Sequence, residues 1–201
     1  MIKLIADSGA TKCEWCLLAN GKSTIIQTQG ISPYFMTLEQ IISLLQNEIL
    51  PKVKKIKVDE IFFYGTGLSN KNNVAVIKNA FKKVFPSSYI EVNDDLLAAA
   101  RALCGKEKGI VCILGTGSNA GYYNGSKIAK NSPGLGYILG DEGSGAYLGK
   151  KVVQYYLYQT FDEELMARFN KRFNTSKDDI LNHVYKQPLA NRYLATYAIF
   201  L

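Results

Sequence analysis

The chain has 201 residues, of which 47% are apolar and 20% are charged, and this composition excludes a disordered chain. No apolar run reaches the ~18 residues that a membrane-spanning helix needs, and Asp7 interrupts the first run too early for a secretory signal. The formal net charge is +7, but the basic residues are scattered, which indicates a solvated surface and not a nucleic-acid site. We therefore expect a cytoplasmic protein with neither nucleic acid nor membrane among its partners.

The first thirty residues predict three antiparallel strands joined by tight turns. Residues 2–6 form a short apolar run, residues 13–18 follow as a second strand, and alternation marks a third at residues 23–29. The first turn carries Gly9, and Asn20-Gly21 between the second and third runs is typical of a two-residue hairpin. A Rossmann fold is excluded because it would place a helix directly after the first strand.

Helices and single strands alternate over the rest of the first half. Helical spacing marks three segments, residues 37–49, 73–84 and 95–103. Short buried strands are expected at residues 61–64 and 89–92. Thr37 is the expected N-cap of the first helix, and Pro51 is expected to end it. The order β-β-β-α-β-α-β-α predicts an α/β lobe, which we bound at residues 1–104.

The second half repeats the opening pattern. Three further strands are expected at residues 110–114, 119–123 and 126–130. Two halves that open with the same unit indicate an internal structural repeat. Helical periodicity then marks residues 152–161, 163–173 and 178–185, and the apolar run 193–201 follows without a polar tail. We therefore expect residues 105–201 to form a second lobe that is incomplete and leaves apolar surface uncovered.

Cys13 and Cys16 have the CxxC spacing of many metal and redox sites, but they fall on a predicted strand. Residues three apart on a strand point to opposite faces, so the two sulfurs are poorly placed to act together. The sequence holds no second CxxC, and His183 is its only histidine. We therefore expect neither a cysteine–histidine metal site nor a redox pair.

Two glycine-bearing turns are candidate phosphate sites. The turn at residues 7–12 joins the first two strands and offers backbone amides and the carboxylate of Asp7, which could hold Mg²⁺ through water. By itself this turn is equally compatible with a plain surface hairpin. The turn at residues 115–118 occupies the equivalent place in the second half, and two matched turns could clamp one polyphosphate. Neither is a Walker A loop, which needs GxxxxGK[ST] at the start of a helix.

Two acidic pairs precede helices, and the residues alone leave their roles open. Asp94 and Asp95 follow a strand, so one acid could cap the next helix and the other could accept a proton from an attacking hydroxyl. Asp141 and Glu142 lie among glycines before another helix. Acids are favourable there for structural reasons, but the glycines also permit close approach of a ligand.

These motifs, in this order and spacing, resemble those of N-acetylglucosamine kinase-like proteins, which belong with the BadF/BadG/BcrA/BcrD ATPases in the actin- and hexokinase-like superfamily. The resemblance covers essentially the whole chain and rests on residues 7–12 with Trp15, 95–102, 114–119 and 140–144. It implies an α/β fold of the actin/hexokinase-like (ribonuclease H-like) type, with two repeated lobes, mixed five-stranded sheets and an incomplete second lobe. It also implies an ATP- and Mg²⁺-dependent kinase that phosphorylates the 6-hydroxyl of N-acetylglucosamine or a similar hexose.

The resemblance further implies roles for individual residues. Asp95, or Asp94 if the register slips by one, matches the catalytic base that deprotonates the sugar hydroxyl. The residues expected at the nucleotide phosphates are Asp7, Gly9, Thr11, Lys12, Gly115, Thr116, Gly117 and Ser118. Asp7 is also expected near Mg²⁺. The residues expected at the sugar are Asn119, Asp141, Glu142, Ser32 and Tyr34.

The resemblance departs from this sequence at one place. Relatives continue beyond residue 201 and there supply an adenosine-binding segment, so a fragment and a natural truncation both fit, and the activity of the 201-residue form is open. The alternative function is a degenerate or truncated sugar-binding regulator without turnover. A third alternative, an ATPase that activates a dehydratase through an iron–sulfur cluster, is disfavoured by the placement of Cys13 and Cys16. The expected partners are a small sugar, a nucleotide and, in a homodimer, a second copy.

Overall fold

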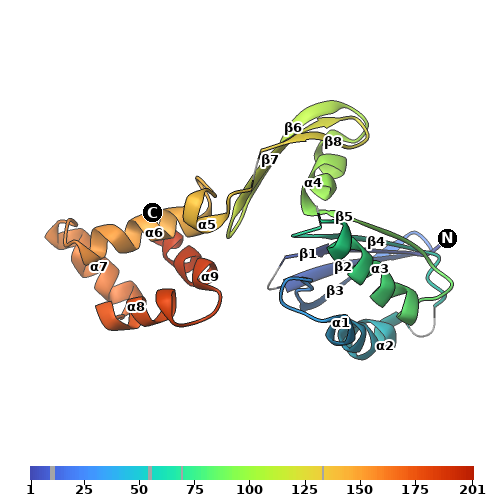
Figure 1. Cartoon of the computed structure of the whole chain (residues 1–201), viewed down its shortest axis with the longest axis horizontal. Helices are drawn as coiled ribbons and strands as arrows, with labels where there is room; N and C mark the ends of the chain where they lie inside the picture. The colour runs from blue at the N-terminus through green and yellow to red at the C-terminus, as the bar shows by residue number, and fades with distance from the viewer. Residues whose placement is uncertain (10–11, 54–55, 69, 133) are drawn as a thin grey trace. The chain divides into compact units, whose positions relative to one another are not determined.

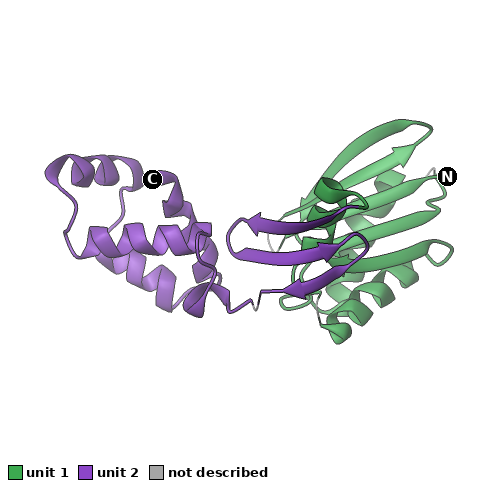
Figure 2. Ribbon diagram, turned by 90° about the horizontal axis from the view of Figure 1, so that it is seen from above, with its two compact units in different colours: residues 1–106 green, residues 107–201 purple. Residues whose placement is uncertain are grey.

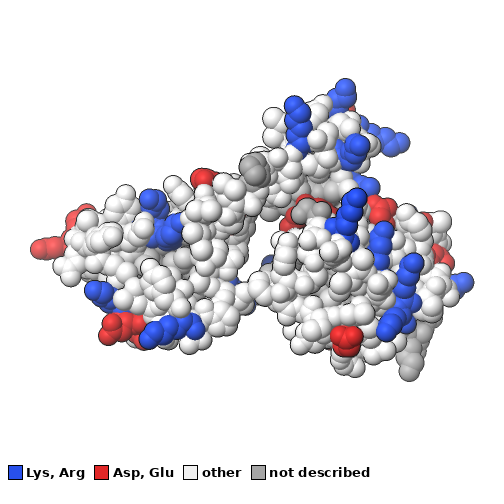
Figure 3. Space-filling view, in the orientation of Figure 1, with Lys and Arg blue, Asp and Glu red and all other residues white. Residues whose placement is uncertain are grey.

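The computed structural model describes residues 1–9, 12–53, 56–68, 70–132 and 134–201. These residues form two units, residues 1–106 and residues 107–201, which are followed along the chain in Figure 1 and coloured separately in Figure 2. Among the described residues, no helix is long and apolar enough to cross a bilayer. On the face drawn in Figure 3, Lys and Arg side chains are spread over both units, several of them in a row on unit 1, and Asp and Glu side chains also occur on both units.

Unit 1, residues 1–106, is built on a mixed sheet. Among its described residues the sheet has five strands, in the spatial order β3-β2-β1-β4-β5. Their bounds are β1 Lys3–Ser8, β2 Lys12–Ala19, β3 Lys22–Gln29, β4 Glu60–Gly65 and β5 Tyr89–Asp94. The first three strands form an antiparallel meander, whereas β4 pairs in parallel with both β1 and β5. The carboxyl ends of β1, β3, β4 and β5 therefore lie along one edge, which we call the carboxyl edge.

Helices cover this sheet. Their bounds are α1 Leu38–Leu44, the π-helix η1 Leu45–Ile49, α2 Leu50–Val53, α3 Lys71–Val84 and α4 Asp95–Cys104. Helices α1 and α3 pack on each other and share an apolar core with the sheet, while α4 contacts β1, β4 and β5. Because α4 starts where β5 ends, its first residues lie at the carboxyl edge.

The prediction that Pro51 ends the first helix is wrong, because the helical path continues through it to Val53. In an α-helix a proline ring clashes with the carbonyl four residues earlier. Here a wider π-turn precedes the proline, in which the Leu50 N–H donates to the carbonyl of Leu45, five residues back, so the chain continues. The predicted N-cap is confirmed, since Thr37 Oγ1 accepts a hydrogen bond from the backbone of the first helical turn.

The core of unit 1 is aromatic. The rings of Trp15, Phe63 and Phe81 are fully buried, and their centroids lie 5.4–6.2 Å apart. Cys13 is buried on the core face of β2, and Cys16 lies on the opposite face, as the strand periodicity predicts. Burial raises the pKa of the Cys13 thiol to about 12, so this sulfur is an inert core side chain and not a redox group.

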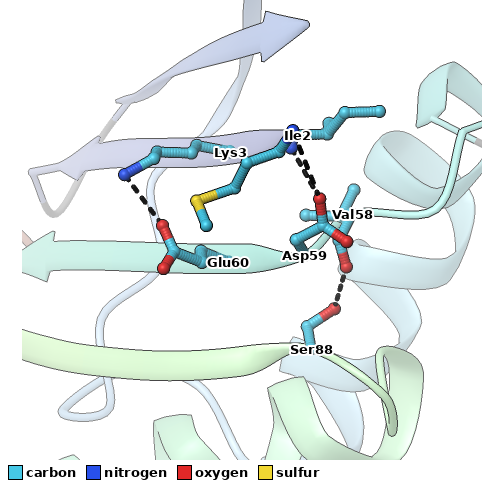
Figure 4. Close-up of polar contacts among 7 residues, drawn as sticks. Ile2, Lys3, Val58, Asp59, Glu60 and Ser88 are labelled. Carbon is cyan, nitrogen blue, oxygen red and sulfur yellow. Dashed lines mark hydrogen bonds and ion pairs between the residues drawn. The ribbon is translucent and has the colours of Figure 1, made fainter.

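Polar contacts hold the amino ends of β1 and β4, at the opposite end of the strands from the carboxyl edge (Figure 4). The backbone N–H of Ile2 donates to Asp59 Oδ2 at 2.7 Å. Next to it, Lys3 Nζ lies 2.8 Å from Glu60 Oε2, which joins β1 to β4 across the sheet. These contacts fix the register of the two central strands at the end that carries no candidate site residue.

Unit 2, residues 107–201, also opens with an antiparallel meander. In the part of this unit that the structure describes, β6 Lys108–Leu114, β7 Ser118–Asn124 and β8 Ile128–Asn131 form a sheet in that order. The helical elements are α5 Gly136–Leu139, α6 Gly145–Leu157, α7 Glu163–Phe173, α8 Lys177–Tyr185, α9 Ala190–Ala195 and the 3₁₀-helix η2 Thr196–Phe200. Both units thus begin with the same meander, as the predicted repeat requires.

The helices of unit 2 pack around Phe169. The ring of Tyr156 stacks on it, with the two centroids 4.0 Å apart. Helix α6 also approaches α9 and η2 very closely at Gly149, where a Cβ atom would overlap the carbonyl oxygen of Leu194. A residue without a side chain is therefore required at this crossing.

The final apolar run of unit 2 is only partly uncovered. Tyr197, from the final apolar run, is buried in the helical core, and only part of that run is exposed. Leu201 of the run remains 79% accessible, and outside the run Ile110 and Leu114 on β6 are exposed to a similar extent, at 79% and 71%. The two β6 residues share one face because they are an even number of residues apart on a strand.

Candidate active site

The first candidate phosphate turn lies at the carboxyl edge, between β1 and β2. The Gly9 N–H donates to the Lys12 carbonyl at 3.0 Å, which closes the turn. The buried hydroxyl of Ser8 accepts a hydrogen bond from the Ile31 N–H at 2.8 Å and donates to the Ile31 carbonyl at 3.1 Å. The end of β1 is thus tied to the segment after β3. Thr11, another predicted phosphate residue, lies outside the described residues.

Asp7 stands at the last position but one of β1, next to this turn. Partial burial raises the pKa of its carboxyl group, and the charge of Glu14, its register partner on β2, acts in the same direction. The Lys12 ammonium partly offsets both effects. A carboxylate whose charge is poorly compensated favours the approach of a cation.

The second acidic group of unit 1 lies where β5 passes into α4, and the structure gives its two acids different roles. Asp94 is the N-cap of α4, and its Oδ1 accepts the Leu96 N–H at 3.0 Å. Asp95 is the first helical residue and is half-buried. Burial raises the pKa of Asp95 to about 7, and the neighbouring charges of Asp94 and Asp7 contribute in the same direction. Asp7 and Asp95 are therefore close enough to interact.

The segment after β3 brings two predicted sugar residues to the same edge. Ser32 is only 2% exposed, and its hydroxyl has no hydrogen-bond partner among the described residues. Tyr34 is exposed, and its ring lies against Gly67, where a Cβ atom would overlap the ring. A buried hydroxyl without a partner costs stability unless a ligand or water completes it, so Ser32 fits a ligand-binding role.

One element of this edge carries no role in the sequence analysis. The turn Gly65-Thr66-Gly67 follows β4, between the ends of β1 and β5. The Thr66 N–H donates to the Ser8 carbonyl at 3.2 Å, and Gly67 has a φ of 77°, which favours glycine. The signal that could have revealed this turn is a Gly-Thr-Gly sequence directly after a buried strand.

Unit 2 holds the second set of predicted residues. In the turn after β6, the Gly115 N–H donates to the Gly117 carbonyl at 2.9 Å. The first amides of α6 donate to this turn, from Gly145 to the Gly115 carbonyl at 2.8 Å and from Ala146 to Thr116 at 3.0 Å. The turn is therefore fixed on the amino end of α6, and any amides offered to a phosphate must come from the turn itself.

The sugar residues predicted in unit 2 lie beside this turn. Asp141 has a φ of 56°, and its carboxylate is so close to Gly117 that a Cβ atom there would lie 2.9 Å from Oδ2. Asn119 Oδ1 is buried and has no hydrogen-bond partner among the described residues. A pocket of about 260 Å³ is lined by Ser118, Asn119, Asp141 and Glu142, together with Cys112, Leu114, Ala120, Ser132, Gly134 and Leu135. The structure thus gathers the predicted residues into two sets, one within each unit.

Comparison with known proteins gives this arrangement a family. No family model matches the sequence. The solved structure of a proposed N-acetylglucosamine kinase from Porphyromonas gingivalis, however, is similar to this chain, with 40% sequence identity and a TM-score of 0.91. The match covers 98% of this chain and 71% of the Porphyromonas gingivalis chain. The chain belongs to the N-acetylglucosamine kinase-like family. The family prediction from the four sequence motifs is confirmed, whereas its extension to the BadF/BadG ATPases stays a prediction.

Other relatives define how far the likeness extends. The N-acetylmuramic acid/N-acetylglucosamine kinase of Clostridium acetobutylicum is 27% identical over 174 residues, which are 80% of this chain and 56% of that protein. The chain spans about half the length of the curated relatives that it matches. The structure of MreB5 of Spiroplasma citri is similar to this chain with a TM-score of 0.55 and 11% sequence identity. The match covers 90% of this chain and 61% of the MreB5 chain. Together with the family, this likeness confirms the predicted α/β fold of the actin/hexokinase-like type.

Proposed function

We propose that the chain carries the sugar-binding and catalytic residues of an ATP-dependent sugar kinase that phosphorylates the 6-hydroxyl of N-acetylglucosamine or a similar hexose. The observation that carries the proposal is the half-buried carboxyl group of Asp95 at the carboxyl edge, close to Asp7. The kinase names of the relatives support the sugar and the reaction. Because ATP is a substrate in this proposal, we place the reaction in the cytoplasm.

In the proposed reaction Asp95 is the base. Its carboxylate accepts the proton of the attacking hydroxyl, while Asp94 is occupied as the cap of α4. A pKa of about 7 suits this role, because a general base works best when its pKa lies near the working pH. Phosphoryl transfer needs little further covalent chemistry from the protein, so the remaining residues act by positioning and by neutralising charge.

We assign the phosphates to the turn of each unit. In unit 1 Lys12 offers its ammonium group and Gly9 allows close approach, because the Gly9 N–H already donates to the Lys12 carbonyl. In unit 2 the turn at residues 115–118 serves through amides other than that of Gly115, which donates to the Gly117 carbonyl, since turns of this kind offer N–H groups to anions. Among the described residues, no group of three or more His, Cys, Asp or Glu side chains could hold a metal ion alone. Asp7 nevertheless fits Mg²⁺ that arrives with a nucleotide, since this ion commonly uses one carboxylate together with water and phosphate oxygens. Bound Mg²⁺ would neutralise developing phosphate charge.

We assign sugar contacts to residues whose polar atoms await a partner. Asn119 Oδ1 and the Ser32 hydroxyl are buried and unpartnered among the described residues, and both can hydrogen-bond to sugar hydroxyls. Asp141 and Glu142 line the pocket with Asn119, and Tyr34 offers an exposed ring beside Ser32.

A homodimer is also proposed, supported by the exposed apolar groups on β6. Light scattering at micromolar concentration tests it, and a monomer would reject it.

A coupled assay for ADP release tests the proposed function. The chain is assayed with ATP, Mg²⁺ and a panel of hexoses and amino sugars, beside Asp95→Asn, Asp94→Asn and the exposed control Asp178→Asn. We expect sugar-stimulated turnover that Asp95→Asn lowers by a factor of about 10² or more, because a positioned base contributes ~10²–10⁴. Asp94→Asn retains more activity, since asparagine also caps helices. Absence of sugar-stimulated turnover across the panel would reject the kinase.

The alternative named in the sequence analysis is a sugar-binding regulator, although the kinase names of the relatives favour the kinase. In this alternative the chain binds sugar without turnover and acts as a regulator. Calorimetry separates the two candidates, because a kinase binds both sugar and nucleotide. Sugar binding with no heat of ATP binding would favour the regulator.

A further inference from the structure

An arginine on α4 joins three elements of unit 1 behind the carboxyl edge. Arg101 Nη1 donates to the hydroxyl of Tyr64 on β4 and to Glu91 Oε1 on β5, both at 2.7 Å. The same carboxylate oxygen accepts the amide of Asn93 at 2.6 Å. We call these four residues the α4 bracket, because they connect the last turns of α4 to the two strands beneath it.

The α4 bracket has more contacts than an isolated surface ion pair. The guanidinium group also lies 5.8 Å from the centroid of the Tyr64 ring, and Tyr64 itself is buried. Although burial works in the other direction, the hydrogen bonds from Arg101 and Asn93 lower the pKa of Glu91. The Glu91 carboxylate is therefore held in its charged form by two donors from two elements.

The α4 bracket lies one register step from the candidate catalytic acids. Tyr64 and Asn93 are register partners on β4 and β5, and the next pair along is Gly65 with Asp94. Asp95 follows directly as the first residue of α4. The Asp94 cap holds the amino end of α4, and Arg101 holds the helix towards its carboxyl end. The two contacts together fix the direction of the α4 axis, and with it the position of Asp95.

We propose that Arg101 is a positioning residue, which holds α4 on β4 and β5 so that the Asp95 carboxylate keeps its place for proton transfer. This inference rests on the proposed kinase function. The side chain of Arg101 touches Tyr64 and Glu91, and it acts on the reaction only through the helix. Displacement of a reacting group by about 1 Å can lower a rate by about 10²-fold, so loss of the bracket should appear mainly in kcat.

The opposite end of the same sheet supplies a matched control (Figure 4). Lys3 and Glu60 lie 2.8 Å apart with side chains 39% and 24% exposed, and Arg101 and Glu91 lie 2.7 Å apart with side chains 39% and 25% exposed. Lys3 also lies 5.6 Å from the centroid of an aromatic ring, that of Phe62. The two ion pairs thus match in length and exposure, although Arg101 also donates to Tyr64, and only one of the pairs lies next to Asp95.

The experiment compares Arg101→Met, Arg101→Lys and Lys3→Met in the coupled kinase assay and in thermal unfolding. We expect both Met variants to lower the melting temperature, and Arg101→Met to lower it more, because it also removes the hydrogen bond to Tyr64. Only Arg101→Met should lower kcat, by about 10- to 100-fold, with the sugar KM changed less than twofold. Arg101→Lys should recover part of the loss, because the ammonium group can still reach Glu91. Unchanged kcat in Arg101→Met, an equal loss in Lys3→Met, or an effect on KM alone would overturn the proposal.

A second measurement separates this proposal from the proposed function. Hydrogen exchange is followed at the amides of the first turn of α4 in the wild-type chain, Arg101→Met, Glu91→Gln and Lys3→Met. We expect faster exchange at Leu96 in the two bracket variants than in Lys3→Met, whether or not the chain turns over sugar. A wild type without sugar-stimulated turnover would reject the kinase, whereas equal protection of Leu96 in all variants would reject the positioning role. If Arg101→Met fails to fold, Glu91→Gln decides.

Discussion

Replacement of Asp95 by asparagine should stabilise the folded chain at neutral and alkaline pH. The pKa of this carboxyl group is raised from 3.8 to about 7, first by burial and then by Asp94 and Asp7. Well below pH 3.8 the group is protonated in both the folded and the unfolded chain and carries no penalty. As the pH rises towards 7, the unfolded chain releases its proton and the folded chain retains it, so the free energy of unfolding falls.

The size of the effect follows from the pKa shift. A difference of about 3 pH units at about 1.36 kcal/mol per unit gives about 4 kcal/mol as an upper limit at pH 8. Because the neighbouring charges of Asp94 and Asp7 contribute to this shift as well as burial, part of the energy belongs to those charges, and we expect Asp95→Asn to gain about 2 to 4 kcal/mol. Asparagine is nearly isosteric and removes the charge, so packing around α4 changes little.

Urea unfolding of the wild type, Asp95→Asn and the exposed control Asp178→Asn at pH 4.5, 6 and 8 provides the measurement. The difference between Asp95→Asn and the wild type should be largest at pH 8 and should shrink as the pH falls. Equal or lower stability of Asp95→Asn at pH 8, or a difference that does not depend on pH, would refute the reasoning. A variant that is more stable and much less active would show the cost of a buried acid at a functional site.

Two further predictions concern unit 2 and the thiols. Gly149→Ala places a Cβ atom on the carbonyl oxygen of Leu194 and should destabilise the chain by about 1–3 kcal/mol in urea unfolding, whereas Gly134→Ala, which meets open space, should change stability by less than about 0.5 kcal/mol. A similar loss in both variants would contradict the close crossing. A thiol reagent at pH 8, followed by mass spectrometry, should modify the exposed Cys112 within minutes and leave Cys13 untouched until the chain unfolds, because burial raises the pKa of Cys13 to about 12. Early labelling of Cys13 would show that β2 opens in the folded chain.

The elements that the sequence predicts well are those whose signal is local. The hairpin at Asn20-Gly21 sets the register of β2 and β3, and both residues have the positive φ that such a turn needs. Helix α7 is found at residues 163–173, because Asp162 caps it and the apolar residues have helical spacing. Where sequence and structure agree, one short stretch of residues is enough to define the element.

The predicted helix ends and starts that are wrong lie where contacts with neighbouring residues override the local sequence signal. Pro51 was expected to end a helix, but the π-turn before it changes the position of the carbonyl that the ring would strike. Helix α6 begins at Gly145 and not at residue 152, since Ser144 caps it and the turn after β6 takes up its first amides. Glycines in the first turn weaken the apolar periodicity, so this start could not be read from spacing.

The candidate site shows the same limit. The sequence predicts that one of Asp94 and Asp95 caps the helix while the other is free. Which acid is the cap depends on the direction of the side chains, and the structure assigns the cap to Asp94. The α4 bracket could not be predicted, because Tyr64 and Arg101 are 37 residues apart and meet only through the pairing of β4 with β5 and the packing of α4 on both strands.

The double hydrogen bond between Ser8 and Ile31 has a consequence for ligand binding. One hydroxyl both accepts from and donates to the same residue, so the end of β1 and the chain entering Ser32 behave as a single rigid piece. An anion that shifts the β1–β2 turn must therefore shift the Ser32 hydroxyl as well. Two ligands that share such a piece change each other's affinity by the same factor, so a phosphate mimic and a sugar should be mutually cooperative or mutually antagonistic, and not indifferent.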